Sequence, residues 1–169
     1  TAFSLLNMVL NTDADFFPIF RYGNFVAENR EKIVKIAQEN LCSYVLFVDA
    51  DMGFPSDALQ KLLVHNKDIV GVNYNYRYMP QECVTKFFPN DLENPPGLRA
   101  VAAIGMGLTL VKTSVFDVIQ KPYFPFSSNE EGEMSMTEDV GFSEKARAAG
   151  FTIWVYPTIK AEHYGLYAY

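Results

Sequence analysis

The sequence contains little of what several protein classes require. Only two of its 169 residues are cysteines, and the spacing of Cys42 and Cys83 fits neither a metal site nor a disulfide framework. We therefore expect reduced thiols and a cytoplasmic protein. Basic residues number 14 against 20 acidic ones, so a nucleic-acid partner, which needs basic stripes, is not expected. No apolar run approaches the roughly 18–20 residues of a membrane span.

Apolar residues, in contrast, are plentiful enough for a sizeable core. They make up 49% of the chain, and aromatic residues make up 15%. The length and this content predict one domain, or slightly less than one, over residues 1–169. Helical spacing predicts helices at 1–10 and 24–41. N-cap residues predict three more: one that begins near Ser56, one at 113–119 that opens on Thr113 or Ser114, and one at 137–149 that opens on Thr137 and is stopped by Gly150. Short apolar runs predict strands at 44–48, 68–72, 84–88, 101–104, 108–111 and 152–156. Residues 121–136 are expected to form a long loop.

The most informative stretch is the apolar run 44–48, which leads directly into Asp49 and Asp51. Because the run is short and a helix follows closely, it is typical of a strand buried on both faces in a parallel α/β sheet. The two aspartates would leave the sheet at its C-terminal edge, where open α/β sheets bind ligands. On an extended backbone both carboxylates point the same way, which favours a bridging divalent cation. The alternative is a pair of helix-capping or turn aspartates.

Other polar residues and glycines are expected near this edge. Arg30 lies on the inner side of its predicted helix. It either extends from the edge of the core or points at the strand ends and pairs with a carboxylate or phosphate. Arg77 ends a polar set that follows the next predicted strand. Gly105 and Gly107 interrupt two apolar runs, which indicates a bulge or a place where a ligand meets the backbone.

Four segments, taken in order, resemble the GT-A class of nucleotide-sugar-dependent glycosyltransferases, and family 2 most closely. The likeness covers about residues 24–165. Residues 47–52 are similar to the D-x-D segment of that class. The other three are 69–72 with Tyr76-Arg77, 105–108 with 111–112, and 138–142 with 149–151, the last being similar to the family's E-D helix. His163 sits where many members place a late histidine ligand for the metal.

The resemblance implies a mostly parallel central sheet flanked by helices, the Rossmann-like fold of nucleotide-diphospho-sugar transferases. Family members usually open with a strand whose edge holds the nucleobase, and nothing before Phe3 supplies one. Either that strand precedes Thr1 and the domain is N-terminally incomplete, or the nucleotide pocket is built differently.

The implied activity is metal-dependent transfer of a hexose from a UDP- or GDP-sugar to a hydroxyl of a glycan or small molecule. Mn²⁺ or Mg²⁺ would be held by Asp51, by Asp49 (alternatively a ribose contact) and by His163. Arg30 and Arg77 would contact the diphosphate, while Gly105 and Gly107 would let the sugar approach the backbone.

Two acidic residues are candidates for the general base. Asp139 is the candidate that would activate the acceptor hydroxyl, with Glu138 as its alternative or support. Both residues open a predicted helix, and acids in the first turn of a helix also suit its dipole, so a structural role is the other interpretation.

Two rival functions come from other classes. The chain could be a non-catalytic nucleotide- or carbohydrate-binding remnant of the same fold. Asp49 and Asp51 also resemble the nucleophile strand of haloacid-dehalogenase phosphatases. In those enzymes the second aspartate is normally followed by a small polar pair, whereas Met52-Gly53 follows it here.

Overall fold

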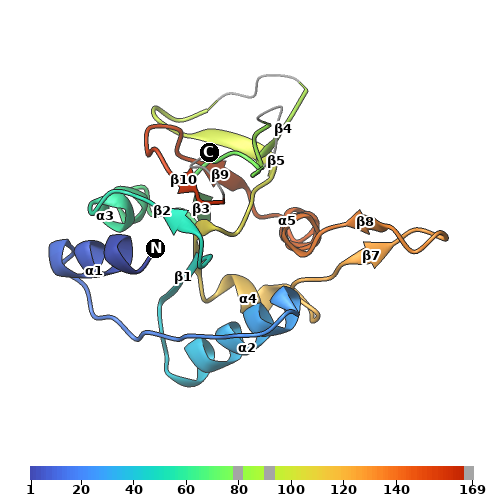
Figure 1. Ribbon diagram of the computed structural model, residues 1–169, viewed down its shortest axis with the longest axis horizontal. Coiled ribbons are helices and arrows are strands. Elements are labelled where there is room, and N and C mark those ends of the chain that lie inside the picture. Colours follow the sequence, from blue (N-terminus) through green and yellow to red (C-terminus); the bar gives the residue numbers. More distant parts are fainter. Residues whose placement is uncertain (78–81, 90–93, 166–169) are drawn as a thin grey trace.

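The structure is a computed structural model that describes residues 1–77, 82–89 and 94–165 (Figure 1). Its helices are α1 (Ala2–Asn11), α2 (Val26–Glu39), α3 (Ala58–Leu63), α4 (Val115–Val118) and α5 (Glu138–Ala148). Its strands are β1 (Tyr44–Val48), β2 (Met52–Gly53), β3 (Ile69–Gly71), β4 (Lys86–Phe87), β5 (Arg99–Ala103), β6 (Leu108–Lys112), β7 (Ser127–Ser128), β8 (Met134–Met136), β9 (Ile153–Val155) and β10 (Glu162–His163).

Six of these strands form the central sheet, in the order β1-β6-β3-β9-β5-β4. The late strand β6 lies between β1 and β3 and is antiparallel to both, with Val45 opposite Val111 and Ile69 opposite Val111 on its other side. Strand β3 is parallel to β9. Consequently β1, β3 and β9 all run in one direction, and their C-terminal ends lie at the same edge of the sheet.

The prediction of a mostly parallel sheet is wrong. Of the five neighbouring strand pairs, only β3–β9 is parallel, and the other four are antiparallel. The error has a physical cause. Helices cover both faces of this sheet, so each central strand is an apolar run whichever way it points. Burial on both faces therefore identified the strands but not their relative directions.

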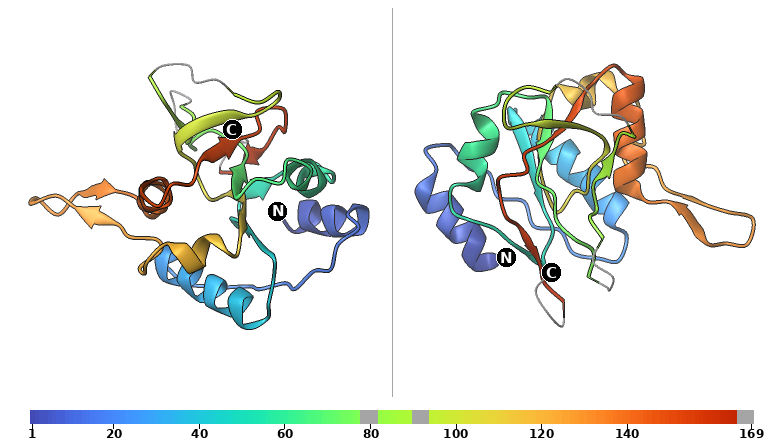
Figure 2. Two further views of the ribbon diagram at one scale, coloured as in Figure 1. Left: turned by 180° about the vertical axis from the view of Figure 1, so that it is seen from behind. Right: turned by 90° about the horizontal axis from the view of Figure 1, so that it is seen from above.

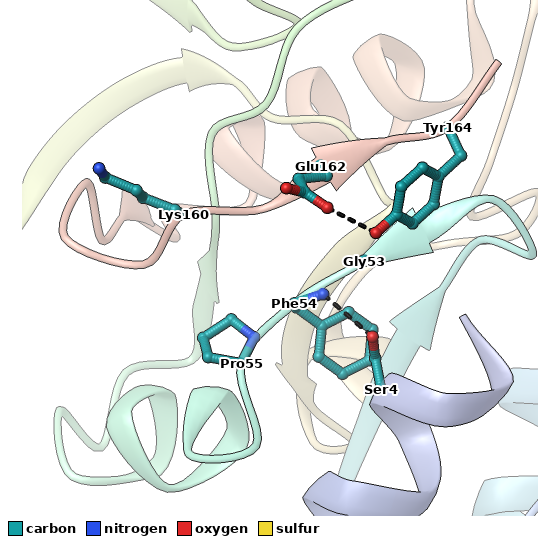
Figure 3. A pocket seen from close by; sticks show the side chains of 7 residues that line it. All are labelled: Ser4, Gly53, Phe54, Pro55, Lys160, Glu162 and Tyr164. Carbon is teal, nitrogen blue, oxygen red and sulfur yellow. Dashed lines mark hydrogen bonds between the residues drawn. The ribbon is translucent and has the colours of Figure 1, made fainter. Parts of the chain in front are cut away.

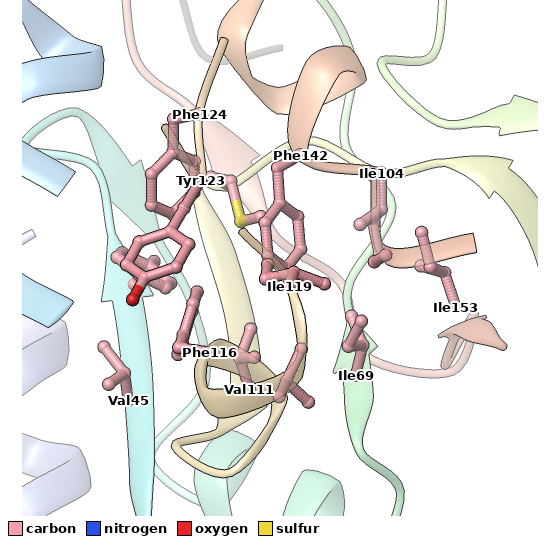
Figure 4. Close-up of a cluster of buried hydrophobic side chains, with 14 of the residues drawn as sticks. Val45, Ile69, Ile104, Val111, Phe116, Ile119, Tyr123, Phe124, Phe142 and Ile153 are labelled. Atoms are coloured by element: carbon pink, nitrogen blue, oxygen red, sulfur yellow. The ribbon is translucent and has the colours of Figure 1, made fainter. Parts of the chain in front are cut away.

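Alternation along the strands divides the buried side chains between two faces. Helices α2, α4 and α5 cover one face, and α1 and α3 cover the other (Figures 1 and 2). The side chains under α2, α4 and α5 form the first core, and those under α1 and α3 form the second. In β1, Val45 and Phe47 point into the first core, while Leu46 packs against the second. Phe124 and Phe142 stack in the first core with ring centroids 5.2 Å apart (Figure 4). Two packed layers of helix thus fix the sheet and its edges.

Several local predictions need correction. The predicted loop 121–136 contains a hairpin, β7–β8, that projects from the body (Figure 1). The predicted strand 84–88 shortens to Lys86–Phe87. Ser56, Thr137 and either Thr113 or Ser114 were the expected N-cap side chains. In the structure the N-cap residues are Asp57 for α3, Ser114 for α4 and Thr137 for α5. None of these three residues makes a side-chain capping hydrogen bond.

Within the part of the chain that the structure describes, no helix is both long and apolar enough to cross a membrane.

Candidate functional site

The D-x-D segment does not continue the extended backbone of β1. The Asp49 N–H donates to the Gly107 carbonyl at 3.1 Å, and the Met52 N–H donates to the Asp49 carbonyl at 3.3 Å, so the chain turns at Ala50 and Asp51. The expectation that both carboxylates share one direction rested on an extended strand and is therefore corrected. Each aspartate has a guanidinium partner of its own.

Asp49 belongs to a buried ion-pair centre around Arg30, which is only 5% exposed. Arg30 Nη2 lies 3.0 Å from Asp49 Oδ1 and 3.4 Å from Oδ2, and Arg30 Nη1 lies 2.6 Å from Glu138 Oε1. One guanidinium thus joins α2, the end of β1 and the start of α5. Of the two interpretations of Arg30, the structure shows the pairing with carboxylates at the strand ends. We call Arg30, Asp49 and Glu138 the Arg30 centre.

Asp51 belongs to a second and more exposed centre. Its Oδ2 atom lies 2.8 Å from Arg77 Nη1 and 3.4 Å from His163 Nε2. The antiparallel pairing of β2 with β10 brings His163 opposite Met52, and the Tyr164 N–H donates to the Asp51 carbonyl at 2.7 Å. The structure thus brings together three predicted residues from distant parts of the sequence. We call Asp51, Arg77 and His163 the Asp51 centre.

The hydrogen bond of the other imidazole nitrogen assigns the tautomer of His163. Its Nδ1 lies 3.1 Å from the Asn75 carbonyl oxygen, and because a carbonyl only accepts, Nδ1 carries the proton. In the neutral ring, the lone pair of Nε2 then faces Asp51 Oδ2. Metal-binding histidines are commonly oriented by such a bond to a backbone carbonyl.

Tyr74 connects the two centres and is a site residue that the sequence interpretation missed. It is 6% exposed, its hydroxyl accepts a hydrogen bond from the Gly107 N–H at 2.9 Å, and its ring meets that of His163 edge-on at 5.3 Å. Burial raises the pKa of Tyr74, and the negative charges of Asp49 and, less strongly, Asp139 raise it further. The only sequence signal was its place in the polar set that follows β3.

Gly105 and Gly107 are both buried beneath Tyr74. A Cβ atom would lie 2.5 Å from the Tyr74 hydroxyl at Gly105 and 2.6 Å from it at Gly107. The absence of side chains here lets Tyr74 lie against the backbone. A donor sugar could approach these glycines only if Tyr74 moved, so their predicted sugar contact stays a prediction.

The two acids at the start of α5 have different surroundings. Glu138 is held by Arg30 at 2.6 Å. Asp139 Oδ1 accepts hydrogen bonds from the Thr137 hydroxyl and from the Val140 N–H, whereas no hydrogen bond to Asp139 Oδ2 is found among the described residues. Asp139 therefore keeps one carboxylate oxygen available as a proton acceptor.

The chemistry of these residues fits a divalent cation at Asp51. Asp49 and Glu138 pair with Arg30, Asp51 pairs with Arg77, and the charge of Asp139 acts on the nearby Tyr74. Four carboxylates and two guanidinium groups leave two negative charges when His163 is neutral. Two ligands that each lie about 2.1 Å from one ion are roughly 3.0–3.4 Å apart, and Asp51 Oδ2 and His163 Nε2 are separated by 3.4 Å. Among the described residues no three His, Cys, Asp or Glu side chains gather around one point, so Asp49 is not beside this pair.

A cavity of about 310 Å³ lies on the opposite face of the β2–β10 ribbon (Figure 3). Side chains alternate along the ribbon, so Glu162 and Tyr164 line this cavity while His163 turns toward Tyr74. The Tyr164 hydroxyl donates to Glu162 Oε2 at 2.5 Å. The remaining lining residues are Ser4, Gly53, Phe54, Pro55 and Lys160.

No protein-family model matches the chain, and no curated protein matches it either. Among solved structures, the crystal structure of A197 from STIV is similar with a TM-score of 0.68 and 20% sequence identity, covering 96% of this chain and 78% of that one. This likeness shows a shared fold. The crystal structure of apo-UDP-glucose pyrophosphorylase matches with a TM-score of 0.49 and 11% identity over 85% of this chain and 56% of that one.

Proposed function

We propose that this chain is a metal-dependent glycosyltransferase of the hexosyltransferase type. It would move a sugar from a UDP- or GDP-sugar to a hydroxyl of a glycan or another small molecule, in the cytoplasm. The observation that carries the proposal is the meeting of Asp51 and His163, with the Nε2 lone pair directed at a carboxylate oxygen 3.4 Å away. The motifs that resemble GT-A enzymes support it, because their residues lie in two connected centres at one sheet edge.

Asp51 and His163 would hold the cation, and the mixed carboxylate and imidazole donors favour Mn²⁺ over Mg²⁺. When bound, the ion would stabilise the negative charge that develops on the leaving diphosphate. A dication also balances the two excess negative charges of the site, which would otherwise repel an anionic donor. Asp49 serves the proposed site indirectly, because its backbone and its pairing with Arg30 fix the start of the turn that carries Asp51.

Asp139 is the proposed general base, and it would accept the proton of the attacking hydroxyl at Oδ2. Hydrogen bonds from Thr137 and Val140 to Oδ1 hold the carboxylate in place. Glu138 is less suited to this task because its Oε1 is bound by Arg30 at 2.6 Å. We assign Arg30 and Glu138 to positioning, since the guanidinium links the end of β1 to the helix that carries Asp139.

The first test is calorimetric titration of UDP and GDP, with and without Mn²⁺, into the wild-type chain and Asp51→Ala. We expect Mn²⁺-dependent nucleotide binding that Asp51→Ala weakens at least about tenfold, the loss of one charged ligand. The control is Asp68→Ala, which removes a carboxylate paired with Lys112 at 3.1 Å at the other end of β3. Equal binding by wild type and Asp51→Ala, or binding that ignores Mn²⁺, would contradict the proposal.

The second test is release of UDP or GDP from a panel of nucleotide-hexoses supplied with sugar acceptors. Asp139→Asn is expected to lower turnover by about 10²–10⁴-fold while nucleotide binding is kept. Glu144→Gln, an exposed change on the same helix, is the matched control. Nucleotide binding without turnover by the wild type would identify the non-catalytic binding module. Phosphate release from simple phosphomonoesters would identify the phosphatase.

A further inference from the structure

One oxygen atom of Asp51 has two nitrogen neighbours of different character. Arg77 Nη1 lies 2.8 Å from Asp51 Oδ2, and His163 Nε2 lies 3.4 Å from the same atom. The lone pair of Nε2 gives His163 no proton to share with this carboxylate when the ring is neutral. The guanidinium of Arg77 carries its charge whatever the state of the His163 ring, so it is a permanent cation beside Asp51 in this structure.

The pairing of Arg77 with Asp51 is of the weak, exchangeable kind. The side chain of Arg77 is 50% exposed and that of Asp51 is 31% exposed, whereas the side chain of Arg30 is 7% exposed. Exposed ion pairs contribute little to the free energy of folding, because water screens the two charges and both side chains must be held in one conformation. A divalent ion bound by both Asp51 and His163 would replace this pair at small cost.

We propose that Arg77 occupies Asp51 until a divalent cation binds, and that the released guanidinium then binds the diphosphate of the donor. This inference rests on the proposed function and deepens it, because it makes Arg77 a donor-binding residue that also orders binding, with the cation before the nucleotide. One guanidinium cannot make its strongest hydrogen bonds to Asp51 and to a phosphate at the same time. Cation binding and nucleotide binding are therefore coupled through Arg77, and the coupling acts equally in both directions.

The chemistry of the released group suits a phosphate. A guanidinium presents a planar fork of donors that matches two phosphate oxygens. Arg77 also follows Asn75, the residue whose carbonyl orients His163, so the polar set after β3 supports the metal ligand and supplies the phosphate contact from one short segment. Arg30 cannot make the same exchange, because both of its terminal nitrogens are held by carboxylates in a buried position.

The experiment measures Mn²⁺ affinity by electron paramagnetic resonance without nucleotide, and UDP or GDP affinity by calorimetry at saturating Mn²⁺. For Arg77→Ala we expect Mn²⁺ to bind about two- to fivefold more tightly, which corresponds to the loss of one exposed ion pair. The nucleotide should bind at least about tenfold more weakly, because a charge-assisted hydrogen bond to phosphate is lost. Tighter Mn²⁺ binding together with weaker nucleotide binding in the same variant is the result that the exchange predicts.

Lys61→Ala is the matched control, since Lys61 forms an ion pair of the same 2.8 Å length with Asp57, also largely exposed. It removes the same charge from the chain and should change neither affinity. Mn²⁺ binding by Arg77→Ala that is no tighter than in this control would overturn the inference and leave the proposed function standing. Tighter Mn²⁺ binding with unchanged nucleotide affinity would overturn the phosphate role. Absence of both Mn²⁺ and nucleotide binding in all three proteins would overturn the proposed function and the inference together.

Discussion

Asp49 and Asp51 are two residues apart, yet they belong to centres of opposite character. Asp49 is bound by a guanidinium that is almost fully buried and that also holds Glu138. Asp51 is bound by a guanidinium that is half exposed and by an imidazole 3.4 Å away. Removing one partner of a buried pair leaves an uncompensated charge, whereas an exposed pair can exchange its cation at little cost.

The difference teaches how one short motif can serve structure and chemistry at once. The Arg30 centre joins α2, the end of β1 and the start of α5, and its buried ion pairs hold these three elements in fixed positions. The Asp51 centre lies on a turn and a two-residue ribbon, where the proposed exchange of one cation for another would leave no buried charge unpaired. The following predictions separate the two roles.

Arg30→Ala should have the largest effect on stability. It leaves Asp49 and Glu138 without their shared cation, and we expect the free energy of unfolding to fall by about 3 kcal/mol, the lower end for a broken buried pair because both carboxylates are partly exposed. Urea denaturation measures it. Lys32→Ala, which breaks the exposed pair of Lys32 with Glu28 on the same helix, should cost about 0.5 kcal/mol or less. Equal losses in the two variants would show that the buried Arg30 pairs stabilise the fold no more than an exposed ion pair does.

Asp49→Asn and Asp51→Asn test the contrast at matched chemistry. The first should lower the free energy of unfolding by about 1–2 kcal/mol, because a buried guanidinium loses a charged partner. The second should change it by about 0.5 kcal/mol or less, because Arg77 remains solvated. Chemical denaturation of both variants side by side is the measurement. A larger loss from Asp51→Asn would reverse the roles given to the two centres.

Tyr74→Phe removes the group that joins the centres. The Gly107 N–H would lose its buried acceptor, so we expect a loss of about 1–2 kcal/mol in the free energy of unfolding. Tyr44→Phe provides a control, because among the described residues the Tyr44 hydroxyl makes a single contact, a long and exposed one of 3.4 Å with Asn66. If both changes cost the same, Tyr74 does not support the site through this bond.

The raised pKa of Tyr74 predicts a smaller, pH-dependent effect. An unfolded chain releases the tyrosine proton near pH 10, while burial and the charge of Asp49 keep Tyr74 protonated in the folded chain. The native state then binds more protons, so stability is intact below about pH 10 and falls as the pH rises above it, by about 1 kcal/mol up to pH 11 for one tyrosine. Denaturation series at several pH values should show a shallower alkaline decline for Tyr74→Phe than for Tyr44→Phe.

Much of the architecture could be predicted from local patterns. The apolar run of β1 and the periodicity of α2 are confirmed, because burial leaves a direct mark on hydrophobic spacing. The helix predicted at 137–149 is confirmed as α5. The order of the strands in the sheet, in contrast, has no counterpart in hydrophobic spacing. The place of β6 between β1 and β3 depends on contacts between residues far apart in sequence, and central strands look alike in either direction.

The site could be predicted in part, for a similar reason. The motifs indicated Arg30, Asp51 and His163, and the structure brings Arg30 to Asp49 and His163 to Asp51. The turn after Asp49 could not be read from spacing, since it depends on a hydrogen bond to Gly107. Tyr74 was missed because a buried tyrosine looks like any core aromatic in sequence until its hydroxyl is placed.

The position of β6 also governs how this protein acquires its structure. Strand β1 has its only described partner in β6, whose paired residues lie 60 to 68 positions later in the sequence, so its ladder cannot form until residues 108–112 are available. Folding then waits for long-range closure rather than proceeding by local hairpins, which is slow because the entropy of a large loop is lost before any pairing is gained. During synthesis, a nascent chain that ends before β6 would carry β1 as an unpaired apolar strand. The sheet edge that holds both aspartates would thus be among the last parts of the molecule to take shape.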